Sequence, residues 1–238
     1  MRGLLVRVGI DSTSGNWNAP VDSTTRRFIF IPIPDCPYNP DGTYIEGGKK
    51  TYETEILPAL EDFSSECGAK EQRAFGLPEN LHKAAMHLDP DFGDLTYGDD
   101  GRRGKPLKTF VAGDFVAFFA GLRPIIELGS CVDSEQVADQ QRLCNAHCRW
   151  TNRQKGNVVV IGESGGILER CIPIGTWREK AYRVTPELLK EWGGFKKLKN
   201  GYLQRSARLP EFEHPEKFMT WFRAQKVSMS RDRYRFKS

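Results

Sequence analysis

The sequence has 238 residues and a formal net charge of +4, with 39% hydrophobic and 28% charged residues, an ordinary balance for a soluble globular protein. Its longest apolar run, around residues 115–122, is far shorter than the roughly 20 residues that a membrane-spanning helix needs. We therefore expect a cytoplasmic protein without membrane contact, folded as one domain over residues 1–238.

Residues 4–10 form a short apolar run that predicts a buried first strand ending at Asp11. Arg7 inside this run argues against a signal peptide. The next loop is rich in Ser, Gly and Asn, and the amides of Asn16 and Asn18 carry the donor and acceptor that reading a base edge requires. Asp11 is thus a candidate catalytic carboxylate and the two asparagines are candidate substrate ligands, unless all three hydrogen-bond their own loop.

Residues 27–33 alternate and are β-branched, which predicts a second strand that Pro32 and Pro34 place at a sheet edge. Residues 51–63 have apolar positions at helical spacing, and residues 84–88 predict a short strand.

Five aspartates follow this short strand, between residues 89 and 100. In extended backbone, His87, Asp89 and Asp91 would point to one face. Such a group can hold Mg²⁺ beside a phosphate, or supply a general base whose pKa is raised by neighbouring charges. Solvated acids in an Asp-Pro turn are the structural alternative. The candidates are Asp89 and Asp99 as catalytic residues and His87, Asp91 and Tyr97 as substrate-binding residues.

Residues 93–104 are predicted to form turns, and residues 108–122 a strand pair or a bent strand broken at Gly113 and Asp114. We expect Asp114 to cap nearby amides rather than to act in catalysis. A helix is predicted at residues 134–143, with Ser134 as its cap.

Cys144, His147 and Cys148 form a C-x-x-H-C cluster, but its spacing is not that of a standard finger and no second ligand pair follows, so we do not expect zinc. His147 is a candidate catalytic proton-transfer group because imidazole changes charge near neutral pH, although a lone histidine is more often structural. Asn145 beside it is a candidate substrate ligand. The six cysteines lack the pattern of a secreted disulfide framework, which indicates a reducing compartment.

Residues 157–161 and 167–174 predict two strands of a hairpin joined by a Gly-rich turn. Thr185 and Pro186 mark a helix start, and the last helix is predicted to begin near Pro215. These elements predict an α+β fold with a mixed, largely antiparallel sheet or a partly closed barrel and with inserted and C-terminal helices. Regular βαβ alternation is absent, which disfavours a doubly wound sheet.

The C-terminal segment, residues 178–238, is basic and aromatic. It has 16 Lys and Arg against 7 Asp and Glu, a net charge of +9, which leaves −5 for the rest of the chain. Aromatic residues such as Trp192, Phe195 and Trp221 interleave with the cations, and stacking combined with positive charge can hold single-stranded or extruded bases. Gln204 and Arg205 are candidate substrate ligands for a phosphate. The alternative is that these cations only solvate helix surfaces.

The sequence has no Walker A loop, no strand-linked Gly-x-Gly-x-x-Gly and no His-Glu-x-x-His. These absences weigh against P-loop hydrolases, Rossmann dehydrogenases and zincins.

Several motifs, in their order along the chain, resemble the third of the nucleotide modification associated domains. They are Gly9-Ile10-Asp11 with the Asn loop, residues 30–34, residues 87–92, Tyr97-Gly98-Asp99, and Gly113-Asp114 with residues 118–122. The resemblance spans about residues 5–210. It implies a role in phage or prokaryotic DNA base modification and draws attention to Asp11, Asp89 and Asp99, but it implies no reaction. The strand after Gly113-Asp114 is also similar to a piece of PUA-like domains, which seat an extruded base in a small barrel.

The leading hypothesis is a transferase or hydrolase of nucleotide or DNA base modification, whose loop carboxylates act on a nucleotide or an extruded base. The alternatives are a non-catalytic module that recognises modified bases in nucleic acid, and an interaction protein without a nucleic-acid role. The clustered carboxylates favour the enzyme. The expected partner is a nucleotide or DNA, Mg²⁺ is the one metal that the acids suggest, and no oligomeric state follows from the sequence.

Overall fold

The computed structural model describes residues 1–11, 15, 17–35, 51–67, 76–99, 101–125, 158–203 and 209–230. Its largest sheet is built on the N-terminal strand β1, Gly3–Arg7. β1 runs parallel to β6, Phe115–Phe119, and antiparallel to β13, Glu211–Phe212. The far edge of β13 pairs with β12, Phe195–Lys196. The sheet therefore joins the first residues of the chain to its C-terminal part.

Strand β1 is buried on both faces, as the apolar run at its position predicts. Leu4 and Val6 pack into a cluster that contains Phe92, whereas Leu5 packs into a second cluster that contains Trp192. This division follows from the alternation of side chains along a strand. The sheet is thus covered on two sides. The cluster on one side includes Phe92, which belongs to the acidic segment that follows residue 88.

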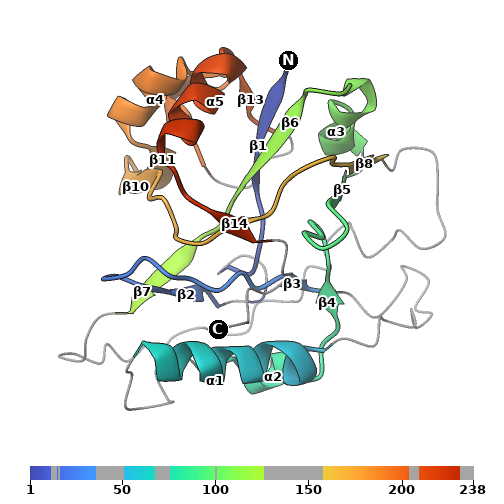
Figure 1. The fold of residues 1–238 in the computed structure, drawn as a ribbon, viewed down its shortest axis with the longest axis vertical. Helices are drawn as coiled ribbons and strands as arrows, with labels where there is room; N and C mark the ends of the chain where they lie inside the picture. The colour runs from blue at the N-terminus through green and yellow to red at the C-terminus, as the bar shows by residue number, and fades with distance from the viewer. Residues whose placement is uncertain are drawn as a thin grey trace.

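Two helices near the C-terminus cover the face that carries Leu5. Helix α4, Pro186–Trp192, and helix α5, Pro215–Ala224, lie together at the top of Figure 1. Both begin with Pro at their first position, where its missing amide hydrogen leaves no intrahelical bond unmade. The helix starts predicted at Thr185 and Pro215 are confirmed.

Aromatic rings form the core beneath these two helices. Trp192 is fully buried, and its ring centroid lies 5.2 Å from that of Phe218 and 4.9 Å from that of Trp221. Phe195 and Trp221 are also buried. The interpretation of Trp192, Phe195 and Trp221 as a surface for stacking bases is therefore wrong, because the sheet needs these rings to cover its apolar face.

A further layer lies at the bottom of Figure 1, where the π-helical turn η1, Tyr52–Ile56, continues into α1, Leu57–Glu66. Thr51 and Thr54 cap the start of η1 reciprocally. Ile56, Leu60 and Phe63 are buried in a cluster with Ile29 and Ile31, which confirms the predicted amphipathic helix. The hydroxyl of Tyr52 donates a hydrogen bond of 2.6 Å to the carbonyl of Pro32, so this helix also holds the segment that leads into β3.

The other described strands form five two-stranded pairs. These are β2 (Ala19–Asp22) with β7 (Leu122–Ile125), in parallel, and, all antiparallel, β3 (Ile33–Pro34) with β4 (Met86–His87), β5 (Thr96–Asp99) with β8 (Val158–Ile161), β9 (Ile167–Leu168) with β14 (Met229–Ser230), and β10 (Gly175–Arg178) with β11 (Ala181–Val184). Short helical elements connect them: α2 (Glu79–His82), α3 (Gly101–Gly104) and the 3-10 turns Leu107–Thr109 and Lys199–Gly201. The fold is α+β, as predicted. Within the described residues no sheet closes into a barrel, so the predicted partly closed or PUA-like barrel is not found there.

Residues 157–174 do not form the predicted hairpin, because β8 pairs with β5 and β9 pairs with β14. The amide of Gly162 donates to the carbonyl of Leu95 at 2.7 Å. A Cβ atom on Gly166 would lie 2.4 Å from the carbonyl oxygen of Ser230. The glycines between the two strands therefore permit close approach by other segments of backbone instead of forming a tight turn.

Two other predicted boundaries are also corrected. Residues 93–104, predicted as turns, contain β5 and α3, and the strand predicted at residues 27–33 is limited to β3. Pro32 and Pro34 lack the amide hydrogen that would extend its ladder. The break predicted at Gly113 is confirmed, although a 3-10 turn and not a strand precedes it. The helix predicted at residues 134–143 lies outside the described residues.

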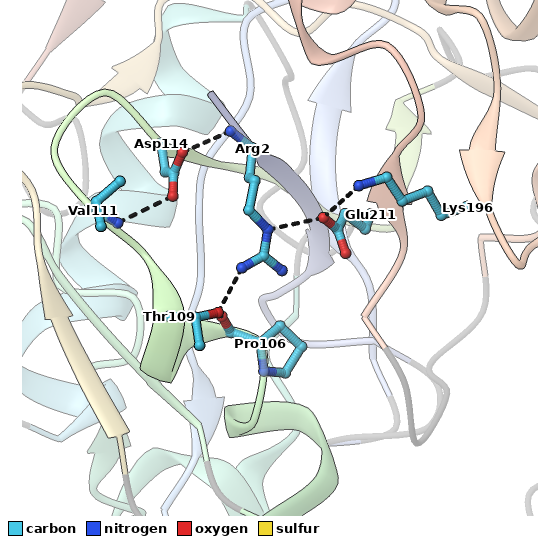
Figure 2. Close-up of polar contacts among 7 residues, drawn as sticks. All are labelled: Arg2, Pro106, Thr109, Val111, Asp114, Lys196 and Glu211. Carbon is cyan, nitrogen blue, oxygen red and sulfur yellow. Dashed lines mark hydrogen bonds and ion pairs between the residues drawn. The ribbon is translucent and has the colours of Figure 1, made fainter.

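Arg2 links the start of β1 to three other segments, as Figure 2 shows. Its backbone amide donates to Asp114 at 2.6 Å, its Nε donates to Glu211 at 2.9 Å, and its Nη1 donates to Thr109 at 2.6 Å. Asp114 also accepts from the amide of Val111 at 3.0 Å, so its predicted capping role is confirmed.

In the described part of the chain, no helix combines the length and the apolar character needed to cross a membrane. Cys67 and Cys171, the two cysteines within that part, carry free thiols.

Candidate functional site

The short strands β3, β4 and β5 and helix α3 bring acidic and basic side chains together into what we call the carboxylate cluster. Figure 1 shows β4, β5 and α3 in succession along one side of the molecule. The cluster consists of Asp35, His87, Asp89, Tyr97, Asp99 and Arg103. Four of these six residues, namely His87, Asp89, Tyr97 and Asp99, belong to the acidic motif that the sequence singles out.

Asp89 is the residue of the cluster whose protonation is most altered. Its side chain is 13% exposed, and its Oδ1 accepts a hydrogen bond of 2.9 Å from the amide of Gly98. Burial raises the pKa of Asp89 from about 3.8 to about 7, and the nearby charge of Asp99 adds to the increase. The Gly98 amide, His87 and Arg103 act in the opposite direction, and burial outweighs them. Asp89 therefore has substantial populations of both protonation states at neutral pH.

Tyr97, Asp99 and Arg103 form a buried triad next to Asp89. The Tyr97 hydroxyl donates to Oδ2 of Asp99 at 2.6 Å, and Nε of Arg103 donates to the same oxygen at 2.8 Å. Asp99 is fully buried and Tyr97 is 5% exposed. Burial, followed by the charge of Asp99, raises the pKa of Tyr97 well above its usual value. The phenol thus remains a hydrogen-bond donor at neutral pH, and Tyr97 and Arg103 together hold the Asp99 carboxyl in place.

His87 lies between two carboxylates. Its Nδ1 is 3.5 Å from Oδ1 of Asp35, and its Nε2 is 3.9 Å from Oδ2 of Asp89. The antiparallel pairing of β4 with β3 sets this arrangement, because His87 lies opposite Ile33 and Asp35 follows two residues later. The imidazole of His87 accordingly faces a carboxylate with each of its two ring nitrogens.

Asp91 has a local structural role. Its Oδ1 accepts from the amides of Gly93 at 2.9 Å and Asp94 at 3.3 Å, and its backbone exchanges two hydrogen bonds with Thr96. This geometry is the side-chain-capped turn that aspartates commonly form. The two carboxylates of the Asp-Pro-Asp motif thus have different environments: Asp91 organises the turn that returns the chain to β5, and Asp89 contacts β4 and β5.

Asp11 is fully buried just beyond the end of β1. Its Oδ2 lies 3.1 Å from Nε of Arg7 in an ion pair. A Cβ atom on Gly121 would lie 3.0 Å from the Arg7 guanidinium and 4.0 Å from Cβ of Asp11, so the space for this pair depends on a glycine. Gly9 has a φ of +78°, and a Cβ there would lie 3.2 Å from the carbonyl oxygen of Ile31. Glycine at positions 9 and 121 therefore has a direct steric explanation.

One extended segment contacts both acidic regions. The carbonyl of Ile31 accepts from the amide of Ile10 at 2.8 Å, immediately before Asp11. Two residues further along the same segment, Ile33 pairs with His87 of the carboxylate cluster. Ile10, directly before Asp11, and His87, two residues before Asp89, thus contact positions 31 and 33 of the same segment. The prediction that Asp11 and Asp89 act in a common site stays a prediction.

Of the other predicted residues, Asn18 is half-buried directly before β2. Asn16, Asn145, His147, Gln204 and Arg205 lie outside the described residues, as do Cys144 and Cys148 of the cysteine–histidine cluster. Among the residues that are described, no group of three or more His, Cys, Asp or Glu has the arrangement of a metal site. The expected Mg²⁺ thus has no complete set of ligands there.

The sequence analysis overlooked Asp35 and did not select Arg103. Asp35 directly follows β3, and a carboxylate at the end of a predicted strand was a usable signal. Arg103 comes four residues after Asp99, a spacing that brings side chains together where the chain is helical. Because residues 93–104 were predicted to form turns, the helix α3 that carries Arg103 was not expected.

The protein is thus an α+β protein in which a largely buried carboxylate cluster contains an aspartate, Asp89, whose pKa is raised by burial to about 7. The sequence model of the family described as nucleotide modification associated domain 3 matches residues 2–230, nearly the whole chain. The protein therefore belongs to this family, as the order of its motifs predicts. A search among curated proteins and a search among solved structures found no match.

Proposed function

We propose that the protein is an enzyme that modifies a nucleotide or a base in DNA, with Asp89 as the group that transfers the proton. Membership of a family named for nucleotide modification supports the substrate class. The observation that supports catalysis is the buried Asp89 carboxyl, whose pKa is raised to about 7. The setting that we propose is the cytoplasm of a prokaryote or of a phage-infected cell.

A carboxyl group that titrates near the working pH is well suited to general acid–base chemistry. Adding a group to a base nitrogen, or hydrolysing a base–sugar bond, requires a proton to be removed or supplied. Such catalysis contributes about 10²- to 10⁴-fold to a rate and is most effective when the pKa lies near the operating pH. An ordinary surface aspartate, ionised at neutral pH, could accept a proton only weakly and could not donate one.

The neighbours of Asp89 have supporting roles in this proposal. Asp99 is fully buried and bonded to Tyr97 and Arg103, so it acts through Asp89 by raising the pKa of that carboxyl. His87 relays or orients a proton between Asp35 and Asp89. Asp11 and Asn18, together with Asn16, Asn145, His147, Gln204 and Arg205, remain the candidates for further catalytic and substrate contacts.

The proposal is tested by comparing Asp89→Asn with Asp94→Asn in cells that express each protein. Asp94 is exposed in the turn after Asp89, so its substitution removes the same charge outside the cluster. Mass spectrometry of nucleosides and free nucleotides should detect a modified species with the wild type and with Asp94→Asn. With Asp89→Asn, its yield should fall about 100-fold or more, because the proton-transfer group is lost.

Thermal unfolding of the purified variants shows whether each one is folded. A folded Asp89→Asn protein with wild-type yield would overturn the assignment of Asp89. A wild-type protein that produces no new nucleoside or nucleotide, but binds DNA containing modified bases, would instead establish the non-catalytic reading function.

A further inference from the structure

The chain continues from β5 into a segment whose charged residues are all cations. Residues 101–113 contain no Asp or Glu, although five aspartates lie between residues 89 and 100. The four cations of the segment are Arg102, Arg103, Lys105 and Lys108. Helix α3, a turn and a 3-10 turn follow one another over residues 101–109, so all four lie on one stretch of nearly helical backbone. A basic element thus directly follows the acidic motif of the carboxylate cluster.

Burial along this segment repeats every three residues. Gly104 and Leu107 are buried, whereas Arg102, Lys105 and Lys108 are exposed. Side chains three residues apart lie on the same side of a helical backbone, and most closely so in a 3-10 turn. The three exposed cations therefore form one solvent-facing row, which we call the cationic row.

The positive charges of the cationic row are available to a ligand. In the part of the chain that the structure describes, none of the three side chains of the row forms an ion pair. Arg103 differs from them, because its Nε donates to Oδ2 of Asp99 at 2.8 Å and its charge is used inside the fold. The row instead directs its charge toward solvent, where it attracts anions.

The cationic row is held in a fixed position beside the carboxylate cluster. The buried Leu107 packs in one core cluster with Tyr97. Arg103 of the same segment bonds to Asp99, and its charge acts to lower the pKa of Asp89. Helix α3 contacts β5, and Figure 1 shows the two next to each other. A ligand bound along the row is thus placed next to the aspartates of the cluster.

We propose that the cationic row binds the phosphate backbone of DNA and positions one of its bases at the carboxylate cluster. The proposal rests on the proposed function and gives it a substrate class, namely a base within a DNA strand and not a free nucleotide. Arg102, Lys105 and Lys108 would each contact a phosphate, while Asp89 would act on the base.

The length of the cationic row favours a polymer as its ligand. Six residues separate Arg102 from Lys108, which corresponds to about 9–12 Å at a rise of about 1.5–2.0 Å per residue. Each strand of DNA carries one phosphate per about 3.4 Å of helix axis, so the row can contact about three phosphates of a strand. A free nucleotide carries its phosphates at one end and would leave part of the row without a partner.

The acidic side chains decide which part of the DNA faces the cluster. The carboxylates of Asp99 and of the exposed Asp94 would repel a phosphate, whereas a base has no net charge to repel. Phosphates along the row and a base at Asp89 therefore avoid contact between like charges. Because Asp89 is largely buried, the base has to leave the stack to reach it, at a cost of a few kcal/mol.

The test measures fluorescence anisotropy of a labelled DNA duplex of mixed sequence, titrated with the full chain at several salt concentrations. Arg102→Gln, Lys105→Gln and Lys108→Gln should each reduce the slope of log K against log salt by about 0.9, the value for one phosphate contact. The triple variant should reduce it by about 2.7, because three contacts are lost. Glutamine keeps a polar side chain in each position, and thermal unfolding of the variants should match wild type because all three positions are exposed.

The matched control is the triple variant Lys190→Gln, Lys217→Gln, Arg223→Gln. It removes the same net charge from exposed positions of α4 and α5, which cover the other face of the central sheet. It should bind DNA with the wild-type slope. An equal loss of slope in both triple variants, or no loss in the triple variant of the row, would overturn the proposal. So would displacement of the duplex by polyglutamate as effectively as by unlabelled DNA, which would assign the row to an acidic protein.

The Asp89→Asn variant separates this proposal from the proposed function. It should bind the duplex with the wild-type slope even though it yields no modified nucleoside. A wild type that modifies free nucleotides but does not bind DNA at low salt would overturn the role of the row and leave the proposed function standing. Binding that depends on the row, together with full activity of Asp89→Asn, would overturn only the assignment of Asp89.

Discussion

The charge state of Asp89 depends on contacts that lie far apart in sequence. Burial removes its carboxyl from water, while one hydrogen bond from Gly98 compensates only part of the lost hydration. Asp99 does not lower the pKa of Asp89. Its own carboxylate is held by Tyr97 and Arg103, and its charge raises the pKa of Asp89 further. Asp91, two positions away, lies in a turn and bonds to local amides. Asp89 and Asp91, two aspartates of one short motif, thus have different hydrogen-bond partners and different roles because their surroundings differ.

The raised pKa of Asp89 predicts how stability changes with pH. The folded protein keeps this proton up to about pH 7, whereas the unfolded chain releases it near pH 4, so the folded state loses stability as pH rises between these values. Asn cannot ionise, so Asp89→Asn should be more stable than wild type by about 2–4 kcal/mol at pH 8, since one pKa unit corresponds to about 1.4 kcal/mol. Urea unfolding at pH 5 and pH 8 measures the difference, which should fall at pH 5 to about a third of its value at pH 8.

Asp94→Asn is the control for this measurement, because it replaces an exposed aspartate of the same segment outside the carboxylate cluster. If Asp89→Asn and wild type lost stability in parallel between pH 5 and pH 8, Asp89 would already be ionised in the folded protein at pH 5. Its role as a proton donor would then have to be abandoned.

Part of this residue pattern is visible in the sequence. Clustered aspartates after a predicted strand indicated a site, and Asp89, Asp99, His87 and Tyr97 do lie together. Asp35 and the Gly98 amide come from other strands, and only the pairing of β3 with β4 and the return of the chain along β5 bring them close. A raised pKa in this group was predicted from neighbouring charges, but burial of Asp89 is its larger cause, and a single sequence gives no measure of that burial.

At the scale of elements, the Glu211 carboxylate of β13 connects this strand to its two neighbours in the sheet. Glu211 of β13 accepts from Nε of Arg2 at 2.9 Å and from Nζ of Lys196 at 3.0 Å, as Figure 2 shows. The bond from Arg2, followed by that from Lys196, holds the pKa of Glu211 below its usual value despite partial burial. Three strands of the central sheet, β1, β12 and β13, are thus joined by one carboxylate.

Removing this carboxylate should weaken the sheet in a manner that depends on pH. The lowered pKa means that Glu211 stabilises the fold above its unfolded pKa and that this contribution is lost as pH falls. Glu211→Gln should lower the free energy of unfolding by about 1–2 kcal/mol at pH 7, the usual size for a charge-assisted bond, and by much less at pH 3.5. Urea titrations followed by circular dichroism measure both values.

Glu213→Gln serves as the comparison, since Glu213 is exposed two residues further along the same segment. It should have little effect at either pH. A loss of equal size in the two variants would mean that net charge, and not the contact with Arg2 and Lys196, explains the effect.

Local patterns predicted helices better than strand partners. Pro186 and Pro215 marked the two helix starts because proline favours the first position of a helix, whereas the Thr185 side chain makes no capping hydrogen bond. The glycines at 162–166 instead suggested a hairpin, whereas β8 and β9 pair with strands more distant in sequence. The pairing of these strands depends on which apolar surfaces the whole fold buries. A short stretch of sequence does not contain this information.

For the molecule as a whole, one aromatic core connects the two ends of the chain. Leu5 of β1 packs in the same cluster as Trp192 of α4 and Trp221 of α5. Neither the sheet nor the C-terminal helices can bury this apolar area alone, so we expect them to unfold together.

Trp192→Ala should therefore destabilise the entire fold, by about 3–5 kcal/mol, the cost of truncating a large buried ring. Trp177→Ala offers a matched control, because it removes the same side chain from an exposed position and should cost about 0.5 kcal/mol. Urea unfolding followed by far- and near-ultraviolet circular dichroism should give one coincident transition for each protein. An early transition confined to the near-ultraviolet signal of Trp192→Ala would show that the C-terminal helices unfold separately.

The pairing of Leu4 with Glu211 has a consequence for how the protein is made. Strand β1 is synthesised before its antiparallel neighbour β13, which follows about 200 residues later, roughly 10–40 s at common translation rates. During that interval the nascent chain displays Leu4, Leu5 and Val6 without the rings that finally enclose them. An early and reversible association with β6, which precedes β13 in the chain, would then protect this hydrophobic strand until β13 is available.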